Sequence, residues 1–188
     1  MAHVQNILLI GSSGLVGKAI QAELLAKRGN FSKLGALSSS ASAPDPKKAA
    51  YWESLSAQGV EITTVDFFDS AALVRAFKGK HLSFSCELNN VLIASIVGWD
   101  VVISAVGLPM VKMQLLMIEA AAVAGVKRFL PSEFGFDLTI PCNRGEKVYA
   151  MKIAVADKLE EISDRYPKFT YTLLAIGLWH NSGPSRCD

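Results

Sequence analysis

Short apolar runs alternate with stretches of helical periodicity along most of the chain. Aliphatic residues dominate the run Val4–Ile10, and Ile20, Leu24 and Leu25 then recur at helical spacing before Gly29. Apolar runs of this kind predict strands buried on both faces, and their alternation with helices is typical of a parallel sheet. The predicted strands are Val4–Ile10, Lys33–Leu37, Val60–Val65, Asp100–Ala105, Val126–Leu130 and Phe169–Ile176, and the predicted helices are Leu15–Arg28, Lys47–Gln58, Asp69–Phe77, Pro109–Ala124 and Glu146–Arg165. Right-handed crossovers then favour an α/β fold with a doubly wound parallel sheet.

Residues 80–98 interrupt this alternation. They show no clean period, whereas a loop from helix to strand usually takes about 2–6 residues. Removing them would join Gly79 to Trp99 and leave an ordinary connection. One interpretation is a further helix or strand near Asn89–Val97. We favour the other, an insertion foreign to the fold.

Composition narrows the class of protein. Apolar residues make up 51% and charged residues 19% of the chain, which excludes a disordered chain. The net charge of +2 comes with scattered Lys and Arg, so the sequence does not predict a nucleic-acid-binding surface. The cysteines have no CxxC spacing and the histidines have neither metal-ligand nor triad spacing, so we expect reduced thiols, no metal site and a cytoplasmic location. These residues are Cys86, Cys142, Cys187, His3, His81 and His180.

The apolar stretch Val91–Val111 is long enough to cross a bilayer. Asp100 lies in its middle, where a charge costs about 2.5–3.5 kcal/mol on insertion scales. Gly107 and Pro109 then interrupt it. A strand followed by a helix explains the same residues, so we expect no membrane segment here.

The most informative motif is a glycine-rich turn between the first predicted strand and helix. Gly11 permits a tight turn, Gly14 lets a pyrophosphate approach the backbone, and Gly17 allows close packing of helix and strand. The helix N-terminus adds free N–H donors for the phosphates. The alternative is a strand–turn–helix with no ligand. The motif predicts an NAD(P)-binding Rossmann fold with the cofactor-binding residues Gly11, Ser12, Ser13, Gly14, Leu15, Val16 and Gly17.

The end of the second predicted strand bears on the choice between NAD and NADP. An acidic residue there would bind the ribose 2′-hydroxyl of NAD. The sequence instead has the hydroxyls of Ser38, Ser39 and Ser40, followed by Lys47 and Lys48. This pattern favours NADP modestly, although these residues could equally belong to a solvated loop.

Two further segments carry a resemblance to a known family. Val102–Gly107 reads Val-Ile-Ser-Ala-Val-Gly, and residues 128–135 read Arg-Phe-Leu-Pro-Ser-Glu-Phe-Gly. Together with the glycine turn, they resemble the NmrA-like, isoflavone reductase-like group of atypical short-chain dehydrogenases. The resemblance covers residues 4–79 and 99–177, and Pro-Ser-Glu-Phe-Gly is its most specific motif.

The resemblance implies roles for individual residues. Gly11–Gly17 would hold the NADPH phosphates, and Val106 and Gly107 would lie along the cofactor. Lys47 matches a lysine that holds the 2′-phosphate in the plant reductases, whereas the accompanying arginine position falls on Ser38. This departure leaves the NADP preference open.

Lys152 matches the lysine that acts as general acid/base in those reductases. The substrate-contacting arginine four residues later is Ala156 here, which argues against the plant phenylpropanoid substrates. Tyr149 stands one residue too close for the Tyr-x-x-x-Lys pair of ordinary short-chain dehydrogenases, so we predict Lys152 alone as catalytic. The alternative is an exposed helix charge.

The expected function is therefore NADPH-dependent reduction of a small substrate, and this substrate class includes aromatic molecules. A non-catalytic NAD(P)-binding regulator with a protein partner is the rival, and an inactive, incomplete product is a third interpretation. The predicted organisation is one domain over residues 1–177 with the insertion at 80–98, a tail at 178–188, and no C-terminal substrate region. On this basis we expect cofactor binding with little turnover.

Overall fold

The computed structural model describes residues 6–40, 46–79, 98–141, 143 and 149–177. Six strands form one sheet in the order β3-β2-β1-β4-β5-β6, and every pair of neighbours is parallel. The strands are β1 (Asn6–Ile10), β2 (Lys33–Ser39), β3 (Glu61–Val65), β4 (Val101–Ser104), β5 (Arg128–Leu130) and β6 (Thr170–Tyr171). This order is that of the doubly wound Rossmann fold, so the predicted fold class is confirmed.

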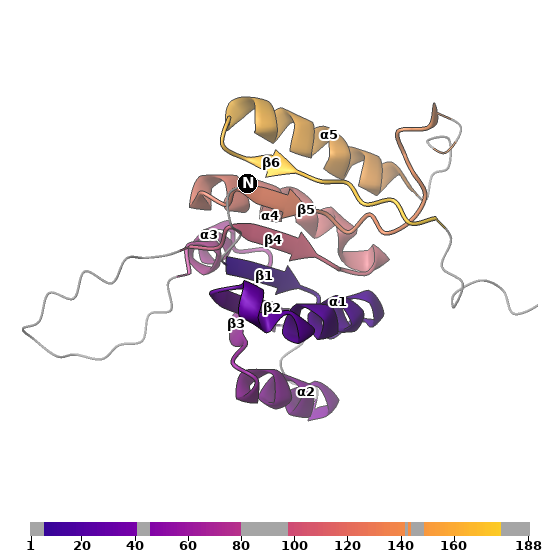
Figure 1. The fold of residues 1–188 in the computed structure, drawn as a ribbon. Coiled ribbons are helices and arrows are strands. Elements are labelled where there is room, and N and C mark those ends of the chain that lie inside the picture. Colours follow the sequence, from indigo (N-terminus) through magenta and orange to yellow (C-terminus); the bar gives the residue numbers. More distant parts are fainter. Residues whose placement is uncertain (1–5, 41–45, 80–97, 142, 144–148, 178–188) are drawn as a thin grey trace, which may run out of the picture.

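Helices cover both faces of the sheet. Figure 1 shows α2 beside β3 at one end of the sheet and α5 beside β6 at the other. The helices are α1 (Leu15–Ala26), α2 (Pro46–Ala57), α3 (Ser70–Phe77), α4 (Gln114–Ala124) and α5 (Ala150–Arg165), with 3-10 turns η1 (Arg28–Asn30) and η3 (Leu108–Met113). None of the helices in the described part of the chain is long and apolar enough to cross a membrane.

Alternate side chains of β1 point to opposite faces of the sheet. Leu8 and Ile10 belong to the large core under α3, α4 and α5. Ile7 and Leu9 point the other way, into smaller clusters that include residues of α1. The strand is buried along its whole length, as expected of a central parallel strand.

The residues on either side of segment 80–97 contact each other. The main-chain N–H of Trp99 donates to the carbonyl oxygen of Phe77 over 3.3 Å, and its indole N–H donates to that of Ala76 over 3.0 Å. The ring lies on Gly35 of β2, where a Cβ atom would stand 2.3 Å from it. The predicted insertion itself lies outside the described residues, apart from Gly98. Its two flanks nevertheless lie side by side.

Among the described residues, two predicted elements differ from those observed by more than a shift of one or two residues at an end. The strand expected over Phe169–Ile176 is paired only at β6, and the helix expected from Pro109 begins as the 3-10 turn η3. The short pairing has a physical cause, because β5 leads into Pro131, which has no N–H to donate to a neighbouring strand.

Candidate functional site

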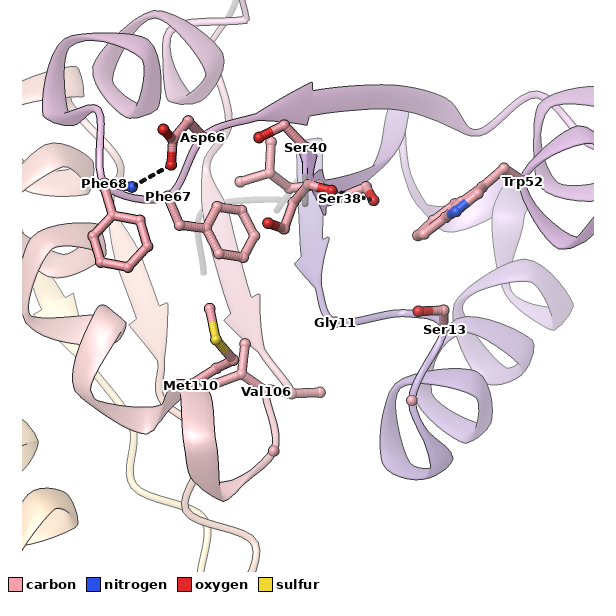
Figure 2. A pocket seen from close by; sticks show the side chains of 15 residues that line it. Gly11, Ser13, Ser38, Ser40, Trp52, Asp66, Phe67, Phe68, Val106 and Met110 are labelled. Atoms are coloured by element: carbon pink, nitrogen blue, oxygen red, sulfur yellow. Dashed lines mark hydrogen bonds between the residues drawn. The ribbon is translucent and has the colours of Figure 1, made fainter. Parts of the chain in front are cut away.

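A cavity of about 670 Å³ opens at the carboxyl ends of the central strands. It lies where the strand order reverses, between β1 and β4, which is the usual ligand position in open α/β sheets. Figure 2 shows its walls, with Trp52 and Ser13 on one side and Phe67 and Phe68 on the other. The lining residues are Gly11, Ser13, Gly14, Leu37, Ser38, Ser39, Ser40, Trp52, Asp66, Phe67, Phe68, Ala105, Val106, Gly107 and Met110.

The glycine turn forms the floor of this cavity. Gly11 has a φ of 81°, in the left-handed region, and a Cβ atom there would stand 2.5 Å from the carbonyl oxygen of Ala105. At Gly17 a Cβ atom would stand 2.0 Å from the carbonyl oxygen of Gly11. Both positions therefore require glycine, and the turn brings bare backbone to the cavity.

The N-terminus of α1 meets the cavity at the same turn. Gly14 is the N-cap residue, and within the described chain no side chain caps this end of the helix. The N–H of Lys18 is bonded to the carbonyl oxygen of Gly14, so the N–H groups of the preceding residues have no partner within the helix. A phosphate placed there would meet these donors and the positive end of the helix dipole.

Helix α2 supports the glycine turn from the side. The hydroxyl of Tyr51 donates to the main-chain oxygen of Ser12 over 2.8 Å, and burial raises the pKa of this hydroxyl. The ammonium of Lys18 stands 5.4 Å from the centre of the same ring. Trp52 packs edge-on against Tyr51 and forms part of the cavity wall.

The opposite wall consists of residues that sequence reasoning missed. Asp66 and Phe67 follow β3 directly, and Phe68 has 74% of its surface exposed. One carboxylate oxygen of Asp66 accepts a hydrogen bond from the N–H of Phe68 over 2.9 Å (Figure 2). The signal was available, because residues that follow a parallel strand lie at its ligand-binding edge. Of the described residues lining the cavity, Asp66 alone carries a formal charge.

The predicted cofactor-binding residues separate into two groups. Those lining the cavity are Gly11, Ser13, Gly14, Ser38, Val106 and Gly107, and those outside its lining are Ser12, Leu15, Val16 and Gly17. The buried Ser12 hydroxyl has no hydrogen-bond partner among the described residues, whereas Leu15 is largely exposed. The side chain of Lys47 lies outside the described residues. The roles of all these residues in binding stay predictions.

The segment after β5 is tied to the cavity wall by Ser132. Its hydroxyl donates to the carbonyl oxygen of Val106 over 2.7 Å, and its main-chain N–H donates to the buried side-chain oxygen of Gln114 over 2.7 Å. Two loops that end neighbouring strands are therefore joined through one serine. This contact accounts for the serine of the Pro-Ser-Glu-Phe-Gly motif in structural terms.

Lys152 lies in the first turn of α5, and its surroundings are well defined. Its ammonium donates to the main-chain oxygen of Glu133 and stands 3.9 Å from one carboxylate oxygen of the same residue. Only 12% of the Lys152 side chain is exposed, so it is not a solvated helix charge. Tyr149 turns instead to Phe136, with ring centres 6.1 Å apart. No group of three His, Cys, Asp or Glu residues in the described ranges is placed to hold a metal ion.

The family model for the NmrA-like family matches residues 3–182. This chain belongs to the NmrA-like family. The predicted resemblance is therefore confirmed. Curated relatives include the phenylcoumaran benzylic ether reductase Betv6 of Betula pendula, 36% identical over 85% of this chain, and eugenol synthase 1 of Petunia hybrida, 32% identical over 85%.

Solved structures agree on the fold of this NmrA-like chain. A structure of isoflavone reductase superposes with a TM-score of 0.69 at 26% identity, covering 95% of this chain and 51% of that one. AtPrR2, solved with NADP+ and (+)pinoresinol, gives a TM-score of 0.71 at 24% identity, covering 93% and 50%. The chain spans about half the length of the curated relatives it matches, 44% for Betv6 and 46% for eugenol synthase 1.

Proposed function

We propose that this NmrA-like chain forms the dinucleotide-binding part of an NAD(P)H-dependent reductase. The observation that carries the proposal is the glycine turn, whose Gly11 and Gly14 bring backbone to a cavity of about 670 Å³, with Gly17 packed closely against Gly11. The cavity lies at the switch point of the sheet, where this fold binds dinucleotides. Relatives solved with NADP+ or NADPH support the same assignment.

The residues present fit such a cofactor. Gly11–Gly14 and the N-terminus of α1 would hold the pyrophosphate. Ser38–Ser40 at the end of β2 would face the adenosine ribose, and Val106 and Gly107 would lie along the nicotinamide half. When bound, the nicotinamide supplies the hydride for reduction. Because Ser38, Ser39 and Ser40, and no carboxylate, stand at the end of β2, we propose NADP(H) as the preferred form.

Lys152 is the residue that we propose for proton transfer. Burial lowers the pKa of its ammonium below the ordinary lysine value, which brings the amine closer to the range useful for acid–base work. Several relatives are named as reductases of benzylic ethers or as isoflavone reductase homologues. A small aromatic carbonyl or ether is therefore the substrate class that we propose.

Calorimetric titration with NADP+ and NAD+ tests this function directly. We expect NADP+ to bind and the Gly14→Asp variant to lose binding, because a carboxylate there would crowd and repel the pyrophosphate. Gly29→Asp is the matched control, since a Cβ at Gly29 meets nothing within 4 Å. Unchanged affinity in a folded Gly14→Asp protein would show that the turn has only a structural role.

One observation favours a second function, dinucleotide binding without turnover. Lys152 is not among the residues that line the dinucleotide cavity, and its ammonium is engaged by Glu133. A regulator that binds NADP(H) and signals through a protein partner needs no exposed catalytic group. NADPH oxidation across a panel of aromatic carbonyls separates the two functions.

A further inference from the structure

Glu133 and Lys152 form a buried pair beside a second cavity. This cavity holds about 250 Å³ and lies between α5, β6 and the segment after β5. Glu133 is among its lining residues, whereas Lys152 is not. The glutamate side chain is only 6% exposed, so it reaches the cavity from within the protein.

An uncommon backbone conformation places the Glu133 carbonyl oxygen against the lysine. Phe134 has a φ of 33°, in the left-handed region, a conformation that costs a non-glycine residue about 1–3 kcal/mol. Its ring is fixed by packing against Leu9 and Ala105. Gly135 lies close to both partners, since a Cβ atom there would stand 3.3 Å from the carbonyl oxygen of Glu133 and 3.4 Å from the lysine nitrogen.

We propose that Glu133 is a positioning residue for Lys152, holding the ammonium through both its carbonyl oxygen and its carboxylate and setting the pH at which the amine loses its proton. The inference rests on the proposed function, in which Lys152 transfers a proton. Burying two charges is costly unless they are paired, and each charge here compensates the other.

The pKa directions agree with this geometry. Burial lowers the pKa of Lys152 and the Glu133 carboxylate opposes that shift, while burial raises the pKa of Glu133 and the ammonium opposes it. Removing the carboxylate should therefore lower the pKa of Lys152 further. Other titratable or charged groups on the packed elements are Asp137 after β5, Asp157 and Glu160 of α5, Tyr171 of β6, Lys112 of η3, and Glu119 of α4, which is paired with Lys158.

Competitive labelling with trace acetic anhydride measures the titration of Lys152 without any turnover. The extent of acetylation, read by mass spectrometry between pH 6 and pH 11, gives the midpoint at which the neutral amine appears. In Glu133→Gln we expect this midpoint to fall by about one pH unit or more. Glu133→Asp keeps the charge on a shorter stem, so its midpoint should lie between those of Glu133→Gln and the wild type.

Glu119→Gln is the matched control, because Glu119 of α4 pairs over 2.6 Å with Lys158, which lies on α5 together with Lys152. It should change the labelling of Lys158 and leave that of Lys152 unmoved. An unmoved Lys152 midpoint in Glu133→Gln, or in Glu133→Asp if the glutamine variant does not fold, overturns the positioning role. NADP+ titration of the same proteins keeps the two proposals apart, since a wild-type protein that binds no dinucleotide overturns the proposed function instead.

Discussion

The hydroxyl of Tyr51 donates a hydrogen bond to the main-chain oxygen of Ser12 over 2.8 Å. This contact joins α2 to the glycine turn across 39 positions of sequence. Tyr51 therefore supports the turn at Ser12, next to Gly11, which lies against the carbonyl oxygen of Ala105. Binding sites of this kind depend on such supporting contacts as much as on the residues that touch the ligand.

Tyr51→Phe removes this hydrogen bond and keeps the ring. We expect a loss of about 1 kcal/mol in the free energy of unfolding, because the Ser12 carbonyl oxygen loses its partner. Affinity for NADP+ should fall about threefold to tenfold as the turn becomes less ordered. Thermal unfolding and calorimetric titration measure the two effects, and a variant with wild-type affinity would assign Tyr51 to folding alone.

Gly17→Ala tests how tightly the turn is packed. The new Cβ atom would stand 2.0 Å from the carbonyl oxygen of Gly11, and backbone must move to accept it. We expect a loss of roughly 2 kcal/mol or more, seen as a melting temperature lower by about 5 °C or more. Gly29→Ala is the control and should stay within about 0.5 kcal/mol of wild type. Equal melting temperatures for the two variants would contradict the packing shown here.

The sequence predicted the sheet because its strands are buried and its glycines mark a sharp turn. It did not predict the aromatic walls of the cavity. In the sequence, Trp52 looks like an ordinary helix residue. Only the packing of α2 beside the glycine turn brings its ring to the ligand-binding edge of the sheet. The position of Phe68 just after β3 indicates the ligand-binding edge, but nothing in the sequence shows that its ring is exposed there. Such placement depends on contacts between elements, which local periodicity does not contain.

The surroundings of Lys152 also could not be predicted from the sequence. Its helix was predicted, and the resemblance identified its position. Its burial depends on Glu133, 19 residues earlier, and on the left-handed turn at Phe134. Neither a phenylalanine in that conformation nor a carbonyl oxygen aimed at an ammonium leaves a sequence pattern. The resemblance therefore located the residue but did not predict its electrostatic environment.

Cofactor preference depends on the end of β2. We expect wild-type protein to bind NADP+ more tightly than NAD+ by about tenfold or less. This ratio corresponds to the contribution of one charge-assisted contact. Ser38→Arg should raise this ratio by a further factor of about ten, because a guanidinium would pair with the 2′-phosphate. Ser38→Gln has a long neutral side chain and controls for bulk. Equal affinity of the wild-type protein for both dinucleotides would contradict the NADP assignment.

Deletion of residues 80–97 tests whether they are an insertion. The cut would join Gly79 to Gly98, whose Cβ position is 3.7 Å from the carbonyl oxygen of Lys78. Gly98 is kept because its carbonyl oxygen accepts a hydrogen bond from the Asn6 side chain over 2.9 Å. We expect the shortened protein to be more soluble and at least as thermally stable. A melting temperature lower by several degrees would show that the segment packs as an element of the fold.

We expect this chain to turn over little or no substrate. Lys152 is not among the described residues that line the dinucleotide cavity, so these residues do not bring its amine and the nicotinamide site together in one cavity. Positioning a substrate against its catalytic groups can contribute many powers of ten to the rate. We therefore expect NADP(H) binding, with NADPH oxidation no faster than in the Lys152→Ala control on a panel of aromatic carbonyls and benzylic ethers. Rapid oxidation by the wild-type protein that disappears in Lys152→Ala would refute this expectation, and would identify Lys152 as the catalytic residue of an active reductase.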